Sequence, residues 1–306
     1  MFSNTIVFGT NEKVLALHGQ LFSDPAKGKL VQHIYFKENF DAFWVAKAVL
    51  KTEFLPNVNS FQGSVSKPEE FYEMLLSIAH ESPNVLKKLK ALPSYKGHIN
   101  TTYYSVLLTF KETLAEIHIN NQGEFMNEAT IEFTRNLNIF PNLKSLRLDA
   151  NFRKLSELEL FLKGCTRLEK LELGNTLPVP TLSSITSDAW MVHNVTRVGS
   201  LEQLTIEREC RPELIEYLTY KYPNIKELTI SLGYNSLNIR DITVFTCSMD
   251  RILRAIEGIE TKEFEFWLQF DYKSTEVVDY FLKKGYSLKI EDTQDDDKLF
   301  IVMEML

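Results

Sequence analysis

The sequence predicts an α/β fold, a right-handed solenoid in which short parallel strands alternate with helices, and three observations support this. A phrase of Pro-Asn followed by spaced aliphatic residues begins at Pro141 and again at Pro223, with a weaker copy at Pro56 and one at Pro83 that carries an extra residue. Similar phrases recur about 28 residues apart over the first half of the chain, and motifs that recur roughly every 20–50 residues are typical of solenoids. Between the phrases, apolar residues fall at helical spacing.

Each copy of the phrase predicts a short strand. An apolar residue is followed by two variable residues, a second apolar residue, one variable residue and a third apolar residue. Such alternation predicts a half-buried strand, and the full pattern is that of a leucine-rich repeat. The copies begin at Val31, Val58, Leu86, Leu114, Leu143, Leu168, Leu201, Ile225 and Thr261, and a degenerate last copy runs through Leu288 and Ile290.

Helices are expected between the strands. Ser66 and Glu69 have the spacing of a capping box ahead of Phe71. A strand, a helix and a second strand within about 28 residues suffice for a right-handed crossover between parallel strands. The Pro of each phrase should end the helix, and the Asn should bond local backbone groups in a turn. Apolar helical faces occur in residues 41–50, 126–137, 212–220, 249–256 and 275–282.

The repeat indicates a single leucine-rich-repeat domain over residues 1–306. Parallel strands should line a concave sheet and helices should cover the convex side of a horseshoe. The spacing lengthens after Leu168 and after Ile225, which predicts insertions there. The expected parts are an N-terminal cap or degenerate repeat (1–30), about ten irregular repeats (31–290) and a C-terminal capping hairpin (291–306).

Composition limits the cellular context and the partners. No apolar run approaches the ~20 residues of a membrane span, and the first residues lack the regions of a signal peptide, so no membrane association is expected. The three cysteines, Cys165, Cys210 and Cys247, are odd in number and far apart, which favours a reducing compartment, cytoplasmic or nuclear. The net charge of −7 disfavours nucleic acid as a partner.

No motif for catalysis or for cofactor binding occurs in the sequence. A phosphate loop, a dinucleotide fingerprint, a nucleophile elbow and a zinc-protease motif are all missing, and the six histidines are dispersed. The chain is therefore predicted not to be an enzyme and to hold no cofactor or metal. The sheet surface is the expected place of function.

The variable strand positions form the candidate binding surface. Alternate side chains of a strand face opposite ways, so the apolar positions should be buried and the variable ones exposed. One exposed row is expected to place Thr229 beside Glu265, and the neighbouring row to place Glu227 beside Glu263. The residues predicted to contact a protein partner are Tyr35, Lys90, His118, Arg147, Glu207, Glu227, Glu263, Glu265 and Trp267.

Charge on this surface is graded, with basic residues in the early and middle strands and acidic residues late. Residues 263–270 alternate strictly, which predicts Trp267 outward beside two carboxylates. An exposed Trp is typical of a binding hot spot, where truncation costs about 2 kcal/mol or more. The alternative is that Trp267 packs under residues 271–274 or under the terminal hairpin. The hypothesis is a protein–protein interaction module whose late concave surface binds a basic segment.

The phrases FPNLKSLRL and CTRLEKLEL resemble the repeat region of fungal-type F-box/leucine-rich-repeat proteins, over about residues 27–290. In that family the F-box docks on the Skp1 adaptor of a cullin ubiquitin ligase, and the repeats select the substrate. The resemblance therefore implies a substrate-recognition subunit as the alternative function, with Skp1 as a partner. This chain has no recognisable F-box, since no Leu-Pro opening precedes Val31. A GTPase activator is a third hypothesis, for which Arg147 and Asn151 are candidates by residue type.

Overall fold

The structure is a computed structural model of the 306-residue chain. For residues 121–125, 184–188, 208, 232, 266–269, 272–274, 288, 290–292 and 298–305 only the backbone is described. The described residues are 4–37, 40–52, 54–65, 67–93, 101–125, 133, 136–152, 154–174, 184–208, 210–232, 241–269, 272–292 and 298–305.

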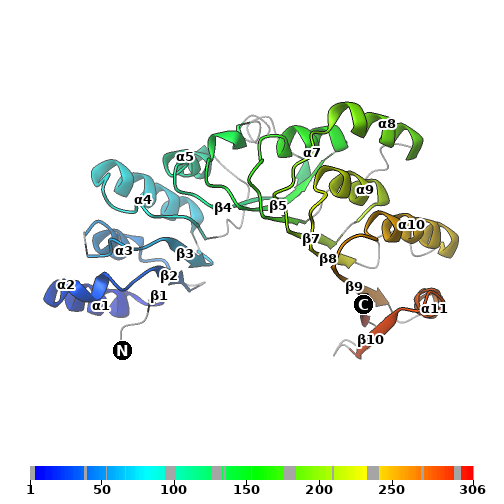
Figure 1. The fold of residues 1–306 in the computed structure, drawn as a ribbon. Coiled ribbons are helices and arrows are strands. Elements are labelled where there is room, and N and C mark those ends of the chain that lie inside the picture. The colour runs from blue at the N-terminus through cyan, green and yellow to red at the C-terminus, as the bar shows by residue number, and fades with distance from the viewer. Residues whose placement is uncertain are drawn as a thin grey trace. The chain divides into compact units, whose positions relative to one another are not determined.

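The chain forms two compact units. The first comprises Met1–Asn120 and Glu128–Ser145, and the second comprises Asn121–Asn127 and Leu146–Leu306. The fold is α/β, with parallel strands in two sheets and helices between the strands (Figure 1). The expected α/β class with parallel strands is therefore confirmed. The expected single continuous sheet is not found, because the strands divide into a three-stranded and an eight-stranded sheet.

The first unit contains the three-stranded parallel sheet. β1 (Thr5–Phe8), β2 (His33–Phe36) and β3 (Ser60–Gly63) pair in sequence order. The other elements of this unit are α1 (Asn11–Ser23), α2 (Pro25–Gly28), α3 (Phe43–Leu50), α4 (Pro68–Glu81), α5 (Thr101–Thr109) and the 3-10 turn η1 (Leu137–Ile139). The capping box expected ahead of α4 is wrong, because α4 begins at Pro68 with Lys67 as its N-cap residue and no side-chain cap bond. Ser66 lies outside the described residues, as does most of the helix expected at 126–137.

Aromatic side chains fill the core of the first unit. The ring of Phe36 contacts those of Phe8, Phe61 and Phe71 in edge-to-face geometry, with centroids 5.3, 5.8 and 5.0 Å apart. Each of these rings is almost completely buried. Edge-to-face pairs place the positive ring edge against the negative ring face, which stabilises them beyond their buried area.

The copy that begins at Leu86 explains why the three-stranded sheet ends at β3. Leu86 and Leu89 are buried as predicted, but residues 83–88 form a turn in which Leu86 adopts a positive φ of 62°. Ala91 joins β3 only through an isolated parallel bridge to Ser60. A bulky residue with positive φ interrupts extended backbone, so the extra residue of this copy yields a turn instead of a strand.

The second unit contains most of the eight-stranded sheet, whose order is β10-β11-β9-β8-β7-β6-β5-β4. β6, β7, β8 and β9 pair in parallel. β4 (Glu116–Phe125) begins in the first unit and ends in the second. The other strands are β5 (Ser145–Asn151), β6 (Lys170–Leu173), β7 (Gln203–Arg208), β8 (Glu227–Leu232), β9 (Thr261–Gln269), β10 (Ser287–Asp292) and β11 (Lys298–Met305). The helices are α7 (Leu155–Leu162), α8 (Ser184–Asn194), α9 (Pro212–Lys221), α10 (Ile242–Ala255) and α11 (Tyr272–Lys283).

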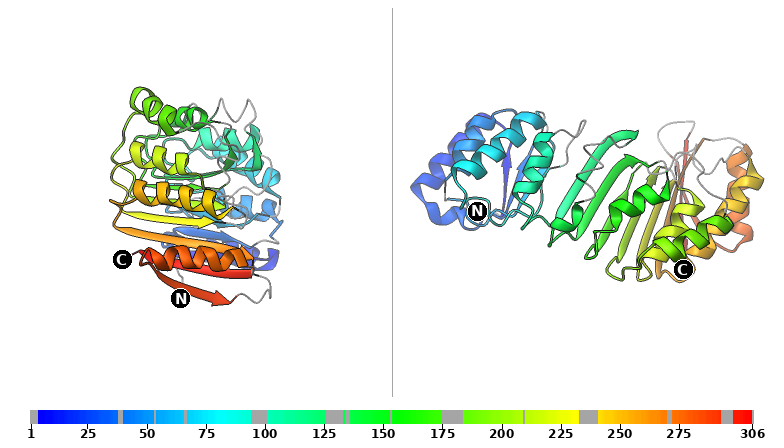
Figure 2. Two further views of the ribbon diagram at one scale, coloured as in Figure 1. Left: turned by 90° about the vertical axis from the view of Figure 1, so that its right-hand side faces the viewer. Right: turned by 90° about the horizontal axis from the view of Figure 1, so that it is seen from above.

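Burial alternates along the strands of this sheet. In β5, Leu146 and Leu148 are fully buried, whereas Arg147 and Asp149 are half-buried. The helices α9, α10 and α11 stack as a layer over one face of the sheet (Figure 2). The apolar positions face the helices, and the variable positions lie on the opposite, solvent-accessible face.

The C-terminal strands form an antiparallel hairpin of β10 and β11. β11 also pairs antiparallel with β9, so it lies between β9 and β10. A C-terminal hairpin was expected at residues 291–306, and the hairpin in the structure begins earlier, with the copy at Leu288 and Ile290 on β10. β11 covers the edge of β9, whose backbone groups would otherwise lack partners.

In three of its four copies, the Pro-Asn phrase joins its repeat to the one before it. Its Asn was expected to bond local backbone groups, but the side-chain Nδ2 donates to a main-chain carbonyl in the preceding repeat. These inter-repeat bonds explain why Asn follows Pro at this point of the phrase, because Asn supplies an N–H donor on a short side chain. The three bonds run from Asn57 to Lys29 (2.7 Å), from Asn142 to Glu112 (2.7 Å) and from Asn224 to Gly199 (2.9 Å).

Candidate functional site

The residues predicted to contact a partner fall into both units. In the first unit, Tyr35 on β2 and Lys90 beside Ala91 are exposed, and His118 on β4 is half-buried. In the second unit lie Arg147, Glu207, Glu227, Glu263 and Glu265. The backbone of Trp267 pairs with that of Phe300, but the side chain of Trp267 lies outside the described part of the structure.

The register of β8 and β9 differs from the predicted one by two residues. Glu263 pairs with Thr229 and Glu265 with Ser231, whereas Glu263 was expected beside Glu227. Because side chains alternate with a period of two, the shift keeps both carboxylates on the predicted face. Buried Ile259 takes the first position of the repeat, which the sequence pattern had assigned to the exposed Thr261.

Arg147 on β5 binds carboxylates from three strands. Its Nε donates to Oδ2 of Asp149 at 3.2 Å, and its Nη1 donates to Oε2 of Glu172 on β6 at 3.1 Å. Its Nη2 donates to Oε2 of Glu207 on β7 at 2.9 Å, so the side chain reaches across β6. The cluster also contains Lys170, whose Nζ lies 2.7 Å from Oε1 of Glu172.

The charges of this cluster stabilise one another. Partial desolvation alone would lower the pKa of Arg147, but Asp149, Glu207 and Glu172 raise it above its ordinary value. Desolvation alone would raise the pKa of Glu172, but Lys170 and Arg147 hold it below its ordinary value. Both groups are therefore charged at neutral pH, and the bond between Arg147 and Glu172 is formed between ions.

Gly174, directly after β6, makes room for this arrangement. A Cβ atom added to Gly174 would lie 2.0 Å from Oδ1 of Asp149, far inside contact distance. The backbone N–H of Gly174 donates to the carbonyl of Leu148 at 2.7 Å, which fixes the chain beside β5. The missing side chain of Gly174 thus allows the Asp149 carboxylate to lie against β6 and to bind Arg147.

Further carboxylates lie on the later strands, and one of them, Glu207 on β7, is the residue that Arg147 binds. We call Glu207, Glu227, Glu263 and Glu265 the acidic strand face. Glu227 accepts a hydrogen bond from Nε2 of Gln203 at 2.7 Å. Glu263 and Glu265 are half-buried, and within the described residues no salt bridge reaches either of them or Glu227. On β8 and β9 the acidic strand face therefore carries negative charge that no ion pair between described residues neutralises.

The net negative charge of the chain lies in the second unit. The chain has 34 Lys and Arg and 41 Asp and Glu. Counted over the unit boundaries, the first unit holds 14 basic and 13 acidic residues, and the second holds 20 and 28. The units thus carry +1 and −8, which together give the −7 of the chain. The acidic strand face lies in the unit that carries the negative charge.

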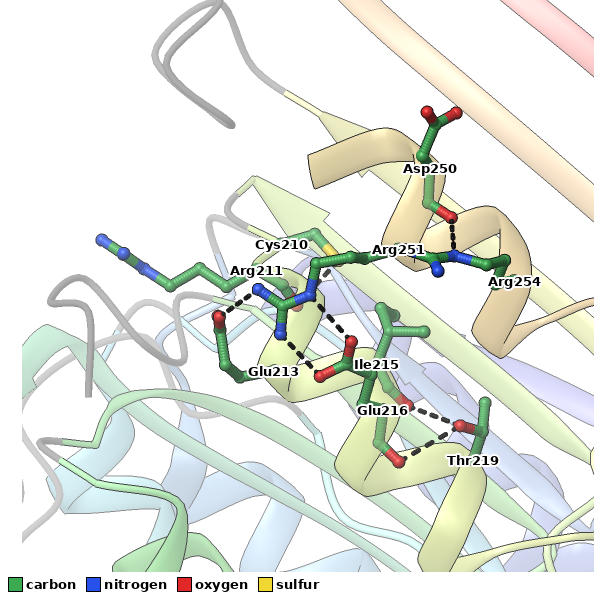
Figure 3. A network of polar contacts seen from close by, with 9 residues as sticks. All are labelled: Cys210, Arg211, Glu213, Ile215, Glu216, Thr219, Asp250, Arg251 and Arg254. Carbon is green, nitrogen blue, oxygen red and sulfur yellow. Dashed lines mark hydrogen bonds and ion pairs between the residues drawn. The ribbon is translucent and has the colours of Figure 1, made fainter. Parts of the chain in front are cut away.

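The helical layer of the second unit holds a separate ionic network (Figure 3). Arg251 on α10 forms a bidentate pair with Glu216 on α9, at 2.9 and 2.7 Å, and a further bond to Glu213 at 2.8 Å. On the same helix, the carboxylate of Asp250 accepts from the hydroxyl of Tyr280 on α11 at 2.6 Å. These contacts join three successive helices, and we assign them to stability.

A second ionic group lies inside the same unit. Lys221 at the end of α9 is fully buried, and its Nζ lies 2.8 Å from Oε2 of Glu159 on α7. The hydroxyl of Tyr217 donates to the same carboxylate at 2.6 Å. Sequence reasoning missed this group, because Glu159 and Lys221 lie 62 residues apart.

The described residues contain no group of three or more His, Cys, Asp or Glu side chains placed to hold a metal ion. In the same part of the chain no helix is long and apolar enough to cross a membrane. The chain matches no protein-family model, and a comparison with curated proteins finds no match.

Proposed function

We propose that this chain is a leucine-rich-repeat protein that acts by binding, and that its acidic strand face binds a basic segment of another protein. The assignment to leucine-rich repeats is supported by the recurring strand phrase and by the bonds from its Asn to the preceding repeat. Solenoids of this type commonly bind partners on an open strand surface.

The observation that carries the proposal is the group of carboxylates on β8 and β9 that no ion pair between described residues neutralises. Glu227, Glu263 and Glu265 lie on adjacent strands of one face, and the face is open to solvent. Lys226, the basic residue nearest in sequence to Glu227, pairs instead with Glu202. Grouped charges of one sign steer a partner of opposite sign and set its orientation.

Charge reversal on this face tests the proposal. Glu263→Lys and Glu265→Lys should each weaken binding of a synthetic arginine-rich peptide by about 1 kcal/mol, or roughly fivefold in Kd, because an attractive contact becomes repulsive. Fluorescence anisotropy at two salt concentrations measures both the affinity and its dependence on screening.

The matched control is Glu276→Lys, which reverses an exposed carboxylate on α11. It changes the net charge by the same amount away from the acidic strand face. An equal loss of affinity in Glu276→Lys would mean that the peptide responds only to net charge, and the proposed site would be wrong.

Trp267 on β9 is proposed as the aromatic anchor of the same surface. Trp267→Ala should weaken partner binding while the thermal midpoint stays close to that of the wild type. A large fall in the thermal midpoint would assign Trp267 to packing instead.

A further inference from the structure

We infer that Arg147, a residue of the chain itself, occupies the position at Glu207 that a basic side chain of the partner would take. Arg147 thereby weakens binding of the partner to the acidic strand face. This inference rests on the proposed function and adds to it a regulating residue and the chemistry of the partner's contact.

The contacts of Arg147 show that this part of the sheet accommodates a guanidinium group. A planar guanidinium offers donors in fixed directions, and here Nε, Nη1 and Nη2 each meet a different carboxylate between 2.9 and 3.2 Å. Carboxylates on β5, β6 and β7 therefore form a receptor for an arginine side chain, and the arginine that fills it belongs to the chain itself.

The three carboxylates differ in their exposure. Asp149 and Glu172 are 20% and 21% exposed, whereas Glu207 is 35% exposed. Glu207 receives a single bond from Arg147, and the two remaining bonds would hold Arg147 in place if that bond were lost. Glu207 is thus the carboxylate that Arg147 can release to an incoming side chain at the smallest cost in free energy.

Glu207 also lies beside β8 and β9, the strands that carry the other carboxylates of the acidic strand face. In the register of the sheet it pairs with Ser231, which pairs with Glu265. An extended segment that crosses β9, β8 and β7 would meet Glu265 first and Glu207 last. The partner that fits is an extended segment with arginines, because the receptor at Glu207 already accepts a guanidinium.

The test measures binding of a peptide in which arginine alternates with serine, and of its lysine counterpart, to the full chain. Arg147→Gln should raise affinity for the arginine peptide roughly threefold to tenfold, because it frees Glu207 and removes a positive charge. Lys170→Gln is the matched control, since it removes an equal charge from the same face but frees a carboxylate that Arg147 still binds. Thermal unfolding confirms that each variant is folded.

A double-mutant cycle separates occupation of Glu207 from a general charge effect. In a Glu207→Gln background, Arg147→Gln should raise affinity no more than Lys170→Gln does. The inference is overturned if Arg147→Gln and Lys170→Gln have equal effects, if the gain persists without Glu207, or if the lysine peptide gains as much as the arginine peptide. If peptide binding depended on Glu263 but was unchanged by Arg147→Gln, the inference about Arg147 would be wrong and the proposed function would stand. An absence of peptide binding by every variant would overturn the proposed function as well.

Discussion

The ammonium group of Lys221 lies 2.8 Å from a carboxylate oxygen of Glu159, and both side chains are almost completely removed from solvent. The pair joins α7 to α9, and Tyr217 and the carbonyl of Thr196 supply further bonds at 2.6 and 3.4 Å. Desolvating two charges is costly, so such a pair is stable only while both members are present.

Removal of one member of this pair should therefore be strongly destabilising. Lys221→Met leaves a buried carboxylate without its counter-ion and should cost about 3–5 kcal/mol of unfolding free energy. The double variant Glu159→Leu/Lys221→Met removes both charges and should be more stable than Lys221→Met. Urea denaturation of the three proteins measures these differences. A double variant less stable than the single one would contradict this account.

The inter-repeat bond of Asn224 provides a second prediction. Asn224→Ala removes the donor to Gly199 and should lower the unfolding free energy by about 1 kcal/mol. Asn224→Asp keeps the shape but replaces the donor by an acceptor that faces a carbonyl, so it should destabilise at least as much. If Asn224→Asp matched the wild type in urea denaturation, the bond would contribute nothing.

Gly174 should be sensitive to the smallest substitution. Gly174→Ala places a methyl group against the Asp149 carboxylate and should cost about 1–3 kcal/mol, the usual range for overpacking. Shortening the neighbour in Gly174→Ala/Asp149→Ala should recover part of this loss, because the clash is with the Asp149 side chain. Thermal unfolding compares the variants, and a double variant with no recovery would place the clash elsewhere.

The cysteines should differ sharply in reactivity. Burial raises the pKa of the Cys165 thiol to about 12, a shift that nearby Lys221 reduces only in part. Burial likewise raises the pKa of Cys210 far above its ordinary value, whereas Cys247 on α10 is exposed. At pH 8 a thiol reagent should modify Cys247 in the folded chain and all three cysteines in denaturant. Mass spectrometry gives the sites, and rapid native labelling of Cys165 would contradict its burial.

The sequence by itself determined the local structure of most of the chain. The spacing of Leu143, Leu146 and Leu148 predicted a strand with one buried face, and β5 has that strand and that face. The helical pattern at 212–220 likewise predicted α9. Patterns of this kind are readable because a strand or helix repeats its side-chain directions with a fixed period.

Register, edge covering and the charge clusters were decided by the tertiary structure. Ile259 rather than Thr261 begins the repeat that contains β9, because the larger apolar side chain is buried there. Glu263 therefore pairs with Thr229 and not with Glu227. β11 lies beside β9 because the open edge of β9 needs backbone hydrogen-bond partners, and the repeat pattern does not specify which strand supplies them. Arg147 meets Glu207, and Lys221 meets Glu159, over separations of 60 and 62 residues. Such contacts depend on the distance between packed elements, which periodicity within one element does not contain.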